Sequence, residues 1–335
     1  MALEEFDELR RLQRLRDRFL RCETAEEGVA DYWRDVRDLR AYDAVFAQRI
    51  GWKWDAVLDA VRRELSGFAP TQAVDWGCGT AIASRRLVAH FPGCERVFLH
   101  DRSNASMDFA AQRLEAEHSD VEIARLAEFP GIEADPLLIS HVLGEMSPCD
   151  EVALIARVRT SRTVIWVEPG SKAVARRLSA IRDLLRDEFV VLHPCPHQGP
   201  CAALENASDW CHFFATPPAE IFQSSDWMRL GRRLGLDLRS LPYHVLVLGR
   251  RDAFPDRPTF PAENVARMLG RPDLGNKEAR VCFCSARGLE RMRLVKSRNK
   301  ELFRRMKKHA NEFGLVRVEV EKDRLLDIED LPCPP

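Results

Sequence analysis

Hydrophobic residues recur at helical spacing through the first 65 residues of the chain. At the start they are Leu3, Phe6, Leu9, Leu12, Leu15 and Phe19. This spacing places them on one face of a helix. The stretch GWKWDAVLDAVRREL continues the pattern as far as Gly67 and Pro70. We therefore predict an N-terminal helical region over residues 1–69.

From residue 70 the pattern changes to short apolar runs that alternate with longer amphipathic stretches. Predicted strands cover 73–77, 96–101, 121–126, 137–143 and 162–168, with helices at 81–90, 104–117 and 149–158. A further helix at 171–187 precedes strands at 189–193 and 243–251. Strands that alternate with helices indicate βαβ units. The predicted fold class of residues 70–251 is α/β, with a Rossmann-type parallel sheet.

A proline-rich stretch, DAFPDRPTFPAE (252–263), reads as a linker into a small C-terminal unit, 252–335. Within that unit, ARVCFC (279–284) and ERMRLVKS (290–297) predict a hairpin, followed by a basic helix over 299–312.

Opposite charges nearly cancel over the whole chain, with 51 basic and 52 acidic residues. They are unevenly placed, because ten basic residues and two acidic ones lie between Arg287 and Lys308. Such a segment can follow a phosphate backbone, so we predict an RNA partner. The alternative is a solvated helix face.

The chain has no apolar stretch near the roughly 20 residues that cross a bilayer, which predicts no membrane partner. The start, MALEEFDELRRL, lacks the apolar core of a signal peptide. We expect a cytoplasmic protein, in which the ten cysteines stay reduced.

A glycine pair marks the turn from the first predicted strand into the first helix, in VDWGCGTA (74–81). Gly77 and Gly79 let the backbone turn tightly and let a ligand approach it. Asp75 precedes them, and Asp101 at the end of the second strand is suited to bond ribose hydroxyls. A dinucleotide site would need a third glycine, where Ile82 stands. We therefore predict S-adenosylmethionine binding; the alternative is a sheet that binds no ligand.

The segment SHVLGEMSP (140–148) follows the fourth predicted strand, where a substrate would lie. His141 and Glu145 are candidates for an acid/base step. The alternative is that both line the cofactor pocket or cap the next helix. Cys78, in the glycine loop, is interpreted as a packing residue.

Three cysteines crowd into CPHQGPCAALENASDWCHFF (195–214), part of a predicted insertion at 194–214. Reduced Cys195, Cys201 and Cys211 would suit a metal site, whereas the alternative is that they are merely buried. A fourth ligand would come from Cys282 or Cys284, which we expect to face opposite sides of a strand, so that one points inward. Zinc and an iron–sulfur cluster both remain open at this point, because each accepts four cysteines.

Two histidines of the same stretch, His197 and His212, are alternative ligands that would favour zinc.

Several of these motifs together resemble one known family. They are VDWGCGTA, SHVLGEM, VIWVEPG, PCPHQGPC with DWCHF, and C-x-x-x-G-L from Cys284 to Leu289. Over about residues 40–310 the chain is similar to the family of the mitochondrial ribosomal small-subunit protein 22, also called methyltransferase-like protein 17, and its bacterial members.

The resemblance implies a class I methyltransferase fold that binds the small ribosomal subunit during assembly, with its rRNA as the partner and ribosomal proteins as further candidates. It also implies a 4Fe-4S cluster on Cys195, Cys201, Cys211 and Cys284. The adenosylmethionine site falls on Asp75, Gly77, Gly79 and Asp101.

Three functions follow as hypotheses. The first is a ribosomal small-subunit assembly factor with a methyltransferase fold that binds rRNA and S-adenosylmethionine, carries an iron–sulfur cluster and, if it is catalytic, methylates rRNA. The second is an RNA-binding iron–sulfur scaffold without turnover, and the third is a zinc-containing small-molecule methyltransferase. In each, we expect metal bonds to replace a hydrophobic core that the C-terminal unit is too short to build.

Overall fold

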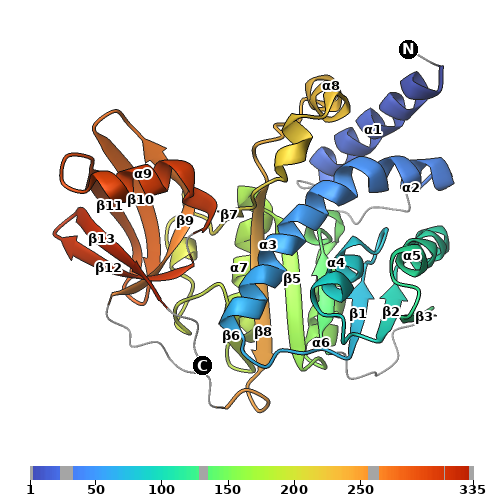
Figure 1. Ribbon diagram of the computed structural model, residues 1–335. Coiled ribbons are helices and arrows are strands. Elements are labelled where there is room, and N and C mark those ends of the chain that lie inside the picture. Colours follow the sequence, from blue (N-terminus) through green and yellow to red (C-terminus); the bar gives the residue numbers. More distant parts are fainter. Residues whose placement is uncertain (1–2, 23–32, 128–134, 256–263, 313, 332–335) are drawn as a thin grey trace. The chain divides into compact units, whose positions relative to one another are not determined.

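The computed structural model describes residues 3–22, 33–127, 135–255, 264–312 and 314–331 (Figure 1). The chain forms two compact units. The first comprises residues 1–59, 68–168 and 215–241, and the second comprises 60–67, 169–214 and 242–335. The predicted domain boundaries at 69 and 251 stay predictions.

Helices dominate the chain before residue 65, as the hydrophobic spacing predicts. They are α1 (Leu3–Cys22), α2 (Val36–Tyr42) and α3 (Gln48–Glu64), with a π-helical turn, Asp43–Ala47, between the last two. Asp35 begins α2, because its side chain accepts hydrogen bonds from the backbone N–H groups of Arg37 and Asp38. Within the described residues, no helix is both long and apolar enough to cross a membrane.

A parallel sheet forms the centre of the first unit, which confirms the predicted α/β fold with a Rossmann-like sheet. Its strands are β1 (Gln72–Trp76), β2 (Arg96–His100), β3 (Glu122–Arg125), β4 (Leu137–Ser140) and β5 (Thr163–Pro169). They run in the order β3-β2-β1-β4-β5, and every pair is parallel. The order reverses between β1 and β4, and ligands of open α/β sheets bind at this switch point.

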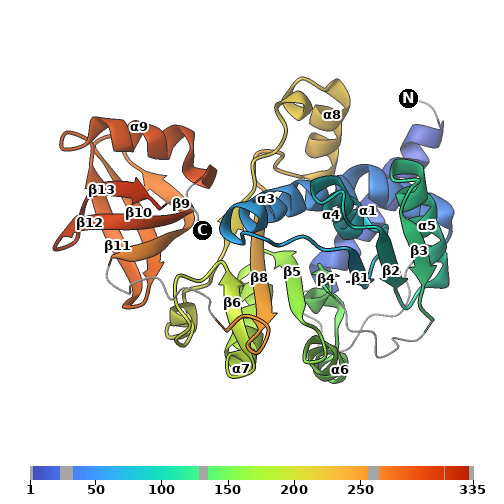
Figure 2. The same ribbon diagram turned by 60° about the horizontal axis from the view of Figure 1, so that its bottom comes forward.

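Helices cover both faces of these strands: α4 (Ile82–His90), α5 (Asn104–Glu117) and α6 (Pro148–Val158). In Figure 2, α4 and α6 lie on opposite faces of the sheet. Capping side chains set where α5 and α6 begin. Ser103 caps α5, and Ser147 with Asp150 forms a capping box for α6.

The remaining helix of the first unit, α8 (Ser225–Leu234), packs against α1 through Leu234 and Leu12.

The second unit contains the end of α3, then α7 (Lys172–Leu185) and the antiparallel strands β6 (Phe189–His193) and β8 (Pro242–Arg250). The short strand β7 (Phe213–Phe214) also pairs with β8.

The C-terminal part of the second unit is a closed barrel of five strands. These are β9 (Val265–Leu274), β10 (Glu278–Ser285), β11 (Gly288–Val295), β12 (Leu315–Glu321) and β13 (Arg324–Asp330). The barrel order is β10-β11-β13-β12-β9, and α9 (Lys300–Lys308) connects β11 to β12. The hairpin and basic helix predicted there exist, whereas β9, β12 and β13 were not predicted. Residues 256–263 of the predicted linker lie outside the described residues.

A hydrophobic core fills this barrel, so the expectation that the unit is too short to build one was wrong. Phe283 and Leu294 are fully buried, and Met306 of α9 packs against them. Strands β12 and β13 supply Val316 and Leu325 to the same cluster. The error arose because β9, β12 and β13 were not predicted. A closed barrel of five strands encloses apolar volume that a single hairpin cannot.

A buried ion pair anchors β9. Glu64, in the last turn of α3, accepts hydrogen bonds from Arg267 at 2.9 and 2.8 Å. His193 also lies 2.9 Å from the Glu64 carboxylate. Burial raises the pKa of Glu64, but the charges of Arg267 and His193 outweigh it and hold that pKa well below its ordinary value.

We predict that Glu64→Gln destabilises the protein by about 3–5 kcal/mol, because it leaves the buried Arg267 guanidinium without a counter-charge. Thermal unfolding measures the loss. Glu122→Gln is the matched control, since Glu122 is exposed and pairs with the exposed Arg96. The control should cost at most about 1 kcal/mol. Equal stability losses in both variants would contradict the prediction.

Candidate functional site

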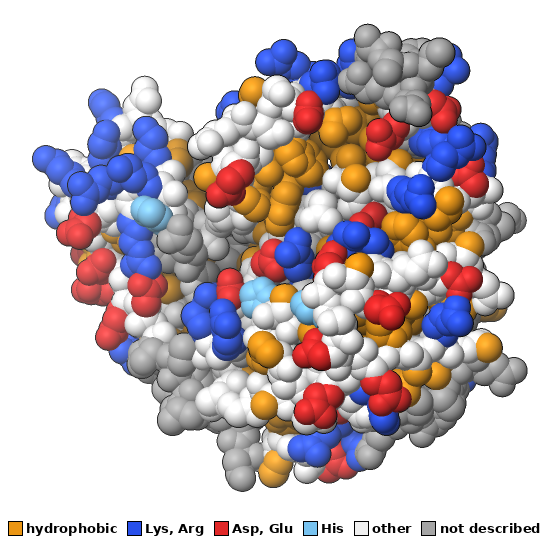
Figure 3. Space-filling view, turned by 45° about the vertical axis from the view of Figure 1, so that its right-hand side comes forward, with side chains coloured by type: hydrophobic (Ala, Val, Ile, Leu, Met, Phe, Trp, Pro, Cys, Tyr) orange, Lys and Arg blue, Asp and Glu red, His pale blue; other side chains and the backbone are white. Residues whose placement is uncertain are grey.

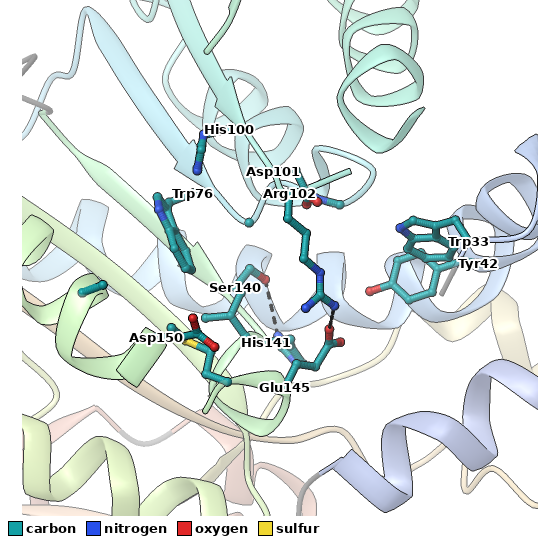
Figure 4. Close-up of a pocket in the computed structure, with 15 residues that line it drawn as sticks. Trp33, Tyr42, Trp76, His100, Asp101, Arg102, Ser140, His141, Glu145 and Asp150 are labelled. Atoms are coloured by element: carbon teal, nitrogen blue, oxygen red, sulfur yellow. Dashed lines mark hydrogen bonds and ion pairs between the residues drawn. The ribbon is translucent and has the colours of Figure 1, made fainter. Parts of the chain in front are cut away.

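A pocket of about 270 Å³ lies at the carboxyl ends of β1, β2 and β4 (Figure 4). Its lining includes Trp76 and Asp101, from the ends of β1 and β2, and His141 after β4. Trp33 and Tyr42 line it from the N-terminal helical region. The pocket lies at the switch point of the sheet, where parallel strands leave a crevice.

The glycine loop forms one wall of the pocket. Gly77 has a φ of +69°, and a Cβ there would meet Val142 Cγ1 at 2.8 Å. The backbone N–H of Gly77 donates to the carbonyl of His100 at 2.8 Å, which ties the end of β1 to the end of β2. Gly79 has a φ of +54°. Both glycines thus occupy conformations that other residues rarely adopt.

Asp101 lies beside this loop, and its role as a ribose ligand stays a prediction. One carboxylate oxygen accepts a hydrogen bond from the Gly79 N–H at 3.0 Å, and the other accepts from the Ser103 N–H at 2.9 Å. Burial raises the pKa of Asp101. Each oxygen keeps a second lone pair, so the carboxylate can accept further hydrogen bonds from a ligand.

Asp75 lies beneath the loop. Within the described part of the chain, its side chain does not reach the pocket lining. One of its oxygens accepts from the Ser84 hydroxyl at 2.7 Å and from the Ser84 N–H at 3.2 Å, near the start of α4. Burial raises the pKa of Asp75 to about 7. These contacts position α4 and the loop.

Aromatic side chains supply walls that the sequence reading missed. Trp33 and Tyr42 meet edge to face, with ring centroids 5.3 Å apart. Burial raises the pKa of Tyr42, so its hydroxyl stays protonated. The neighbours of Trp33 and Tyr42 in sequence carry no motif that marks them. Trp76 was identifiable, because it stands inside the glycine motif.

His141 is held in a strained conformation at the end of β4, with a φ of +55°. Its Nε2 lies 3.0 Å from Lys53 Nζ, and its Nδ1 lies 3.4 Å from Ser140 Oγ. Burial lowers the pKa of His141 well below its ordinary value, and the nearby Lys53 charge lowers it further. The imidazole is therefore neutral, and its Nε2 accepts a hydrogen bond from the ammonium group.

Glu145, the second predicted acid/base candidate, forms an ion pair with Arg102 at 3.0 Å (Figure 4). Arg102 directly follows Asp101 and also lines the pocket. The pair thus places one charge of each sign at the pocket wall.

A buried carboxylate behind the pocket holds the turn that carries His141. Glu168, at the end of β5, accepts hydrogen bonds from the N–H groups of Val142 and Leu143, each at 3.1 Å. Trp166 Nε1 donates to the same oxygen at 2.8 Å. The other oxygen has no hydrogen-bond partner among the described residues. Burial raises the pKa of Glu168 to about 7.

The three cysteines of the insertion and one from the barrel lie in the second unit. Cys201 and Cys284 pack against the buried Cys211. Burial raises the pKa of the Cys201 and Cys284 thiols, and the neighbouring Cys195 raises both further. Cys284 Sγ lies 3.7 Å from His197 Nε2. The four predicted cysteines are therefore close enough to influence one another.

Helix α7 holds the loop that carries these cysteines. Asp183 accepts two hydrogen bonds from the Cys201 N–H, at 3.1 and 3.0 Å. Arg182 donates to the carbonyls of His197, at 3.1 Å, and Gly199. Its side chain is 2% exposed, and in the described structure its Nε has no hydrogen-bond acceptor.

Arg176, nearly two turns earlier in α7, binds the other part of the insertion. Its guanidinium donates to the carbonyls of Ala203, Asn206 and Asp209 at 2.6–2.8 Å.

Cys282 and Cys284 share the outer face of β10, so the expectation that they face opposite sides was wrong. Side chains of a strand alternate with a period of two, which sends the intervening Phe283 into the barrel core. Across β11, Cys284 lies opposite Leu289 and Cys282 opposite Arg291. The two thiols point to the same side of the sheet and differ in their position along β10, and Cys284 is the one that packs against the cysteines of the insertion.

Among the described residues, no group of three or more His, Cys, Asp or Glu side chains converges as a single metal ion requires. The ring of His212 stacks on Trp210 with centroids 4.8 Å apart, and its Nδ1 lies 3.3 Å from the Trp210 carbonyl oxygen.

We predict that thermal stability falls as the pH rises from about 5 to about 8, partly because of Glu168. A carboxyl whose pKa is raised by folding stabilises the folded state below its ordinary pKa, and this contribution is lost as the pH rises through about 7. Glu168→Gln should therefore flatten the pH dependence of Tm, while the exposed control Glu122→Gln should leave it unchanged. An unaltered slope in Glu168→Gln would exclude this carboxyl as the cause.

Comparisons with solved structures find likenesses to methyltransferases. The plantazolicin methyltransferase BpumL with bound SAH is 12% identical, with a TM-score of 0.42, over 72% of this chain and 99% of that one. The magnesium protoporphyrin IX methyltransferase from Synechocystis PCC 6803 is 11% identical, with a TM-score of 0.37, over 70% and 93% of the two chains. Such distant likenesses carry no conclusion about activity. No curated protein matches the sequence.

A family model described as mitochondrial small ribosomal subunit Rsm22 matches residues 41–312. This match includes the glycine loop, the turn with His141 and all four cysteines of the predicted cluster. The chain belongs to the Rsm22 family.

Proposed function

We propose that this protein binds S-adenosylmethionine in the pocket of the first unit and acts on RNA of the small ribosomal subunit. The observation that carries the proposal is the Asp101 carboxylate, which two backbone N–H groups hold beside the glycine loop. Membership of the Rsm22 family supports the ribosomal partner, since the family is described as a small ribosomal subunit protein.

The residues of the pocket suit an adenosyl cofactor. Asp101 offers oxygen acceptors for ribose hydroxyls, and Trp76 and Tyr42 offer aromatic surface for a base or a cationic group. When bound, S-adenosylmethionine supplies an electrophilic methyl group. The chain's own contribution is to position an acceptor, which is the main protein role in such a transfer.

The hydrogen bond between His141 and Lys53 favours a second candidate function, a scaffold that binds RNA without turnover. Lys53 already occupies its Nε2, so this nitrogen would have to exchange partners before it could accept a proton. Incubation of the protein with tritiated cofactor and immature small subunits separates the two. Tritium in RNA supports the enzyme, and RNA binding without tritium supports the scaffold.

We predict that Asp101→Asn weakens S-adenosylmethionine binding about 10- to 100-fold, because the ribose hydroxyls lose a charged acceptor. Isothermal titration calorimetry gives the affinity. Asp108→Asn is the matched control, since Asp108 lies exposed on α5, and it should bind as the native protein does. Unchanged affinity in Asp101→Asn would remove this residue from the site.

We further propose that Cys195, Cys201, Cys211 and Cys284 hold a 4Fe-4S cluster. The thiols are soft donors, which suit iron–sulfur clusters and zinc alike. A four-iron cluster is larger than a single ion, so its ligands need not converge as closely as zinc ligands do. The unpaired Nε of the buried Arg182 supports an anionic group beside it, because that N–H lacks a described acceptor.

We predict that Cys201→Ser loses most of the iron and the visible absorbance of anaerobically purified protein, because three thiols hold the cluster poorly. The barrel should stay folded, since its hydrophobic core contains none of the four cysteines. Cys149→Ser, at an exposed cysteine, is the control and should keep its iron. Equal iron content in both variants would overturn the assignment.

A further inference from the structure

The C-terminal barrel has the strand order of an OB-fold. Numbered along the unit, its strands close in the order 1-2-3-5-4, with a helix between the third and the fourth. The first strand, β9, pairs with both β10 and β12 and contains Gly270, with a φ of +66°, near its middle. Strands β11 and β13 pair in parallel. Each feature matches this five-stranded Greek-key barrel.

OB-folds bind oligonucleotides on the outer face of their second and third strands, between the loops 1–2 and 4–5. Here the face belongs to β10 and β11, and the loops are residues 275–277 and 322–323. Backbone hydrogen bonds bring one loop to Arg293 and the other to Lys296, at the same end of β11. The Arg293 N–H donates to the Asp323 carbonyl at 2.8 Å, and the Lys296 N–H donates to the Lys277 carbonyl at 2.9 Å.

This outer face has two parts. At one end, Cys284 and Leu289 pack against the cysteines of the insertion. At the other end, Arg280 lies opposite Arg293, and their side chains are 70% and 42% exposed. The exposed Lys277 and Lys322 flank this second part from the two loops.

Acidic residues also lie on this face, but they hold the arginines weakly. Glu278 lies 3.7 Å from both Arg280 and Arg293, and Asp323 lies 2.8 Å from Arg293. Asp273 is paired with Arg280 in the strand register. Exposed ion pairs contribute little energy, so phosphate groups can replace these carboxylates.

Aromatic rings lie beside β9, at Gly270 and Arg271. The backbone N–H of Gly270 donates to the His212 carbonyl at 2.9 Å. His212 stacks on Trp210, and the guanidinium of Arg271 lies 4.1 Å above the ring of Phe214. The three rings are half-buried. Aromatic rings together with basic side chains are the combination that binds single-stranded nucleic acid.

We propose that the barrel binds single-stranded RNA across the outer face of β10 and β11. Arg280 and Arg293 contact phosphates, while Trp210, His212 and Phe214 offer stacking surface for bases. The proposal deepens the proposed function, on whose RNA partner it rests. The sequence predicts RNA binding by the basic segment from Arg287 to Lys308, which includes Arg293 of β11 as well as the helix α9.

That helix, α9, is the natural comparison. Its apolar side, with Leu302, Phe303 and Met306, packs into the barrel core. Figure 3 shows Lys and Arg side chains gathered over this part of the surface. If charge density decided the binding site, α9 would bind as well as the strand face.

The experiment measures fluorescence anisotropy of the full chain with a labelled single-stranded RNA of about 12 nucleotides and with the corresponding duplex. The test variant is Arg280→Gln/Arg293→Gln. The matched control, Arg304→Gln/Lys307→Gln, removes the same charge from exposed positions of α9. Circular dichroism and thermal unfolding establish that both variants are folded.

We expect the strand-face variant to bind the single strand at least about 10-fold more weakly, and the α9 variant to change binding by less than about 3-fold. The slope of log affinity against log salt should fall by about 1.4 in the strand-face variant, from about 0.7 per phosphate contact. The native protein should prefer the single strand to the duplex.

Two outcomes overturn the proposal. Equal or greater loss in the α9 variant would leave the RNA partner standing and remove the strand face as its site. Native protein that binds neither RNA, or prefers the duplex, would also reject it. Cofactor affinity, measured on the same samples, shows whether the pocket of the first unit stands independently.

Discussion

The hydrogen bonds between the ends of β1 and β2 are the constraint on which the candidate pocket depends. The N–H groups of Gly77 and Cys78 both donate to the carbonyl of His100. They draw the glycine loop across the end of β2, where Asp101 can in turn accept a hydrogen bond from Gly79. With Val142 packed against Gly77, a side chain there would displace the turn after β4. These hydrogen bonds and the contact between Val142 and Gly77 thus position three of the segments that line the cavity.

Much of the first unit was predictable, because its signals are local. The glycine pair, the capping serines and the apolar strands each act within a few residues, and the parallel sheet follows from their alternation. The residues of the pocket walls were harder to predict from the sequence. Trp33 and Tyr42 reach the site through tertiary packing, and the contact of Lys53 with His141 joins residues far apart in sequence. No spacing rule encodes such contacts.

The barrel was underestimated for two different reasons. The strand β12, LVRVEVE, alternates apolar and charged residues and carried a strand signal that the dense positive charge nearby obscured. The fold of β9 was less evident, because Gly270 and Pro272 interrupt its pattern. At the cysteines the family resemblance indicated Cys284, whereas the strand geometry was misjudged, since residues two apart share a face.

The apolar interior of the barrel bears on how long the protein survives in a cell. Chains that unfold are removed by proteases, so a domain that needs an inorganic centre to fold disappears when that centre is scarce. A barrel that encloses Phe283 and Leu294 needs no such centre for its own packing. Loss of the proposed cluster would then alter the surface around Cys284 and leave the barrel folded, so that the amount of protein in the cell would not depend on the metal supply.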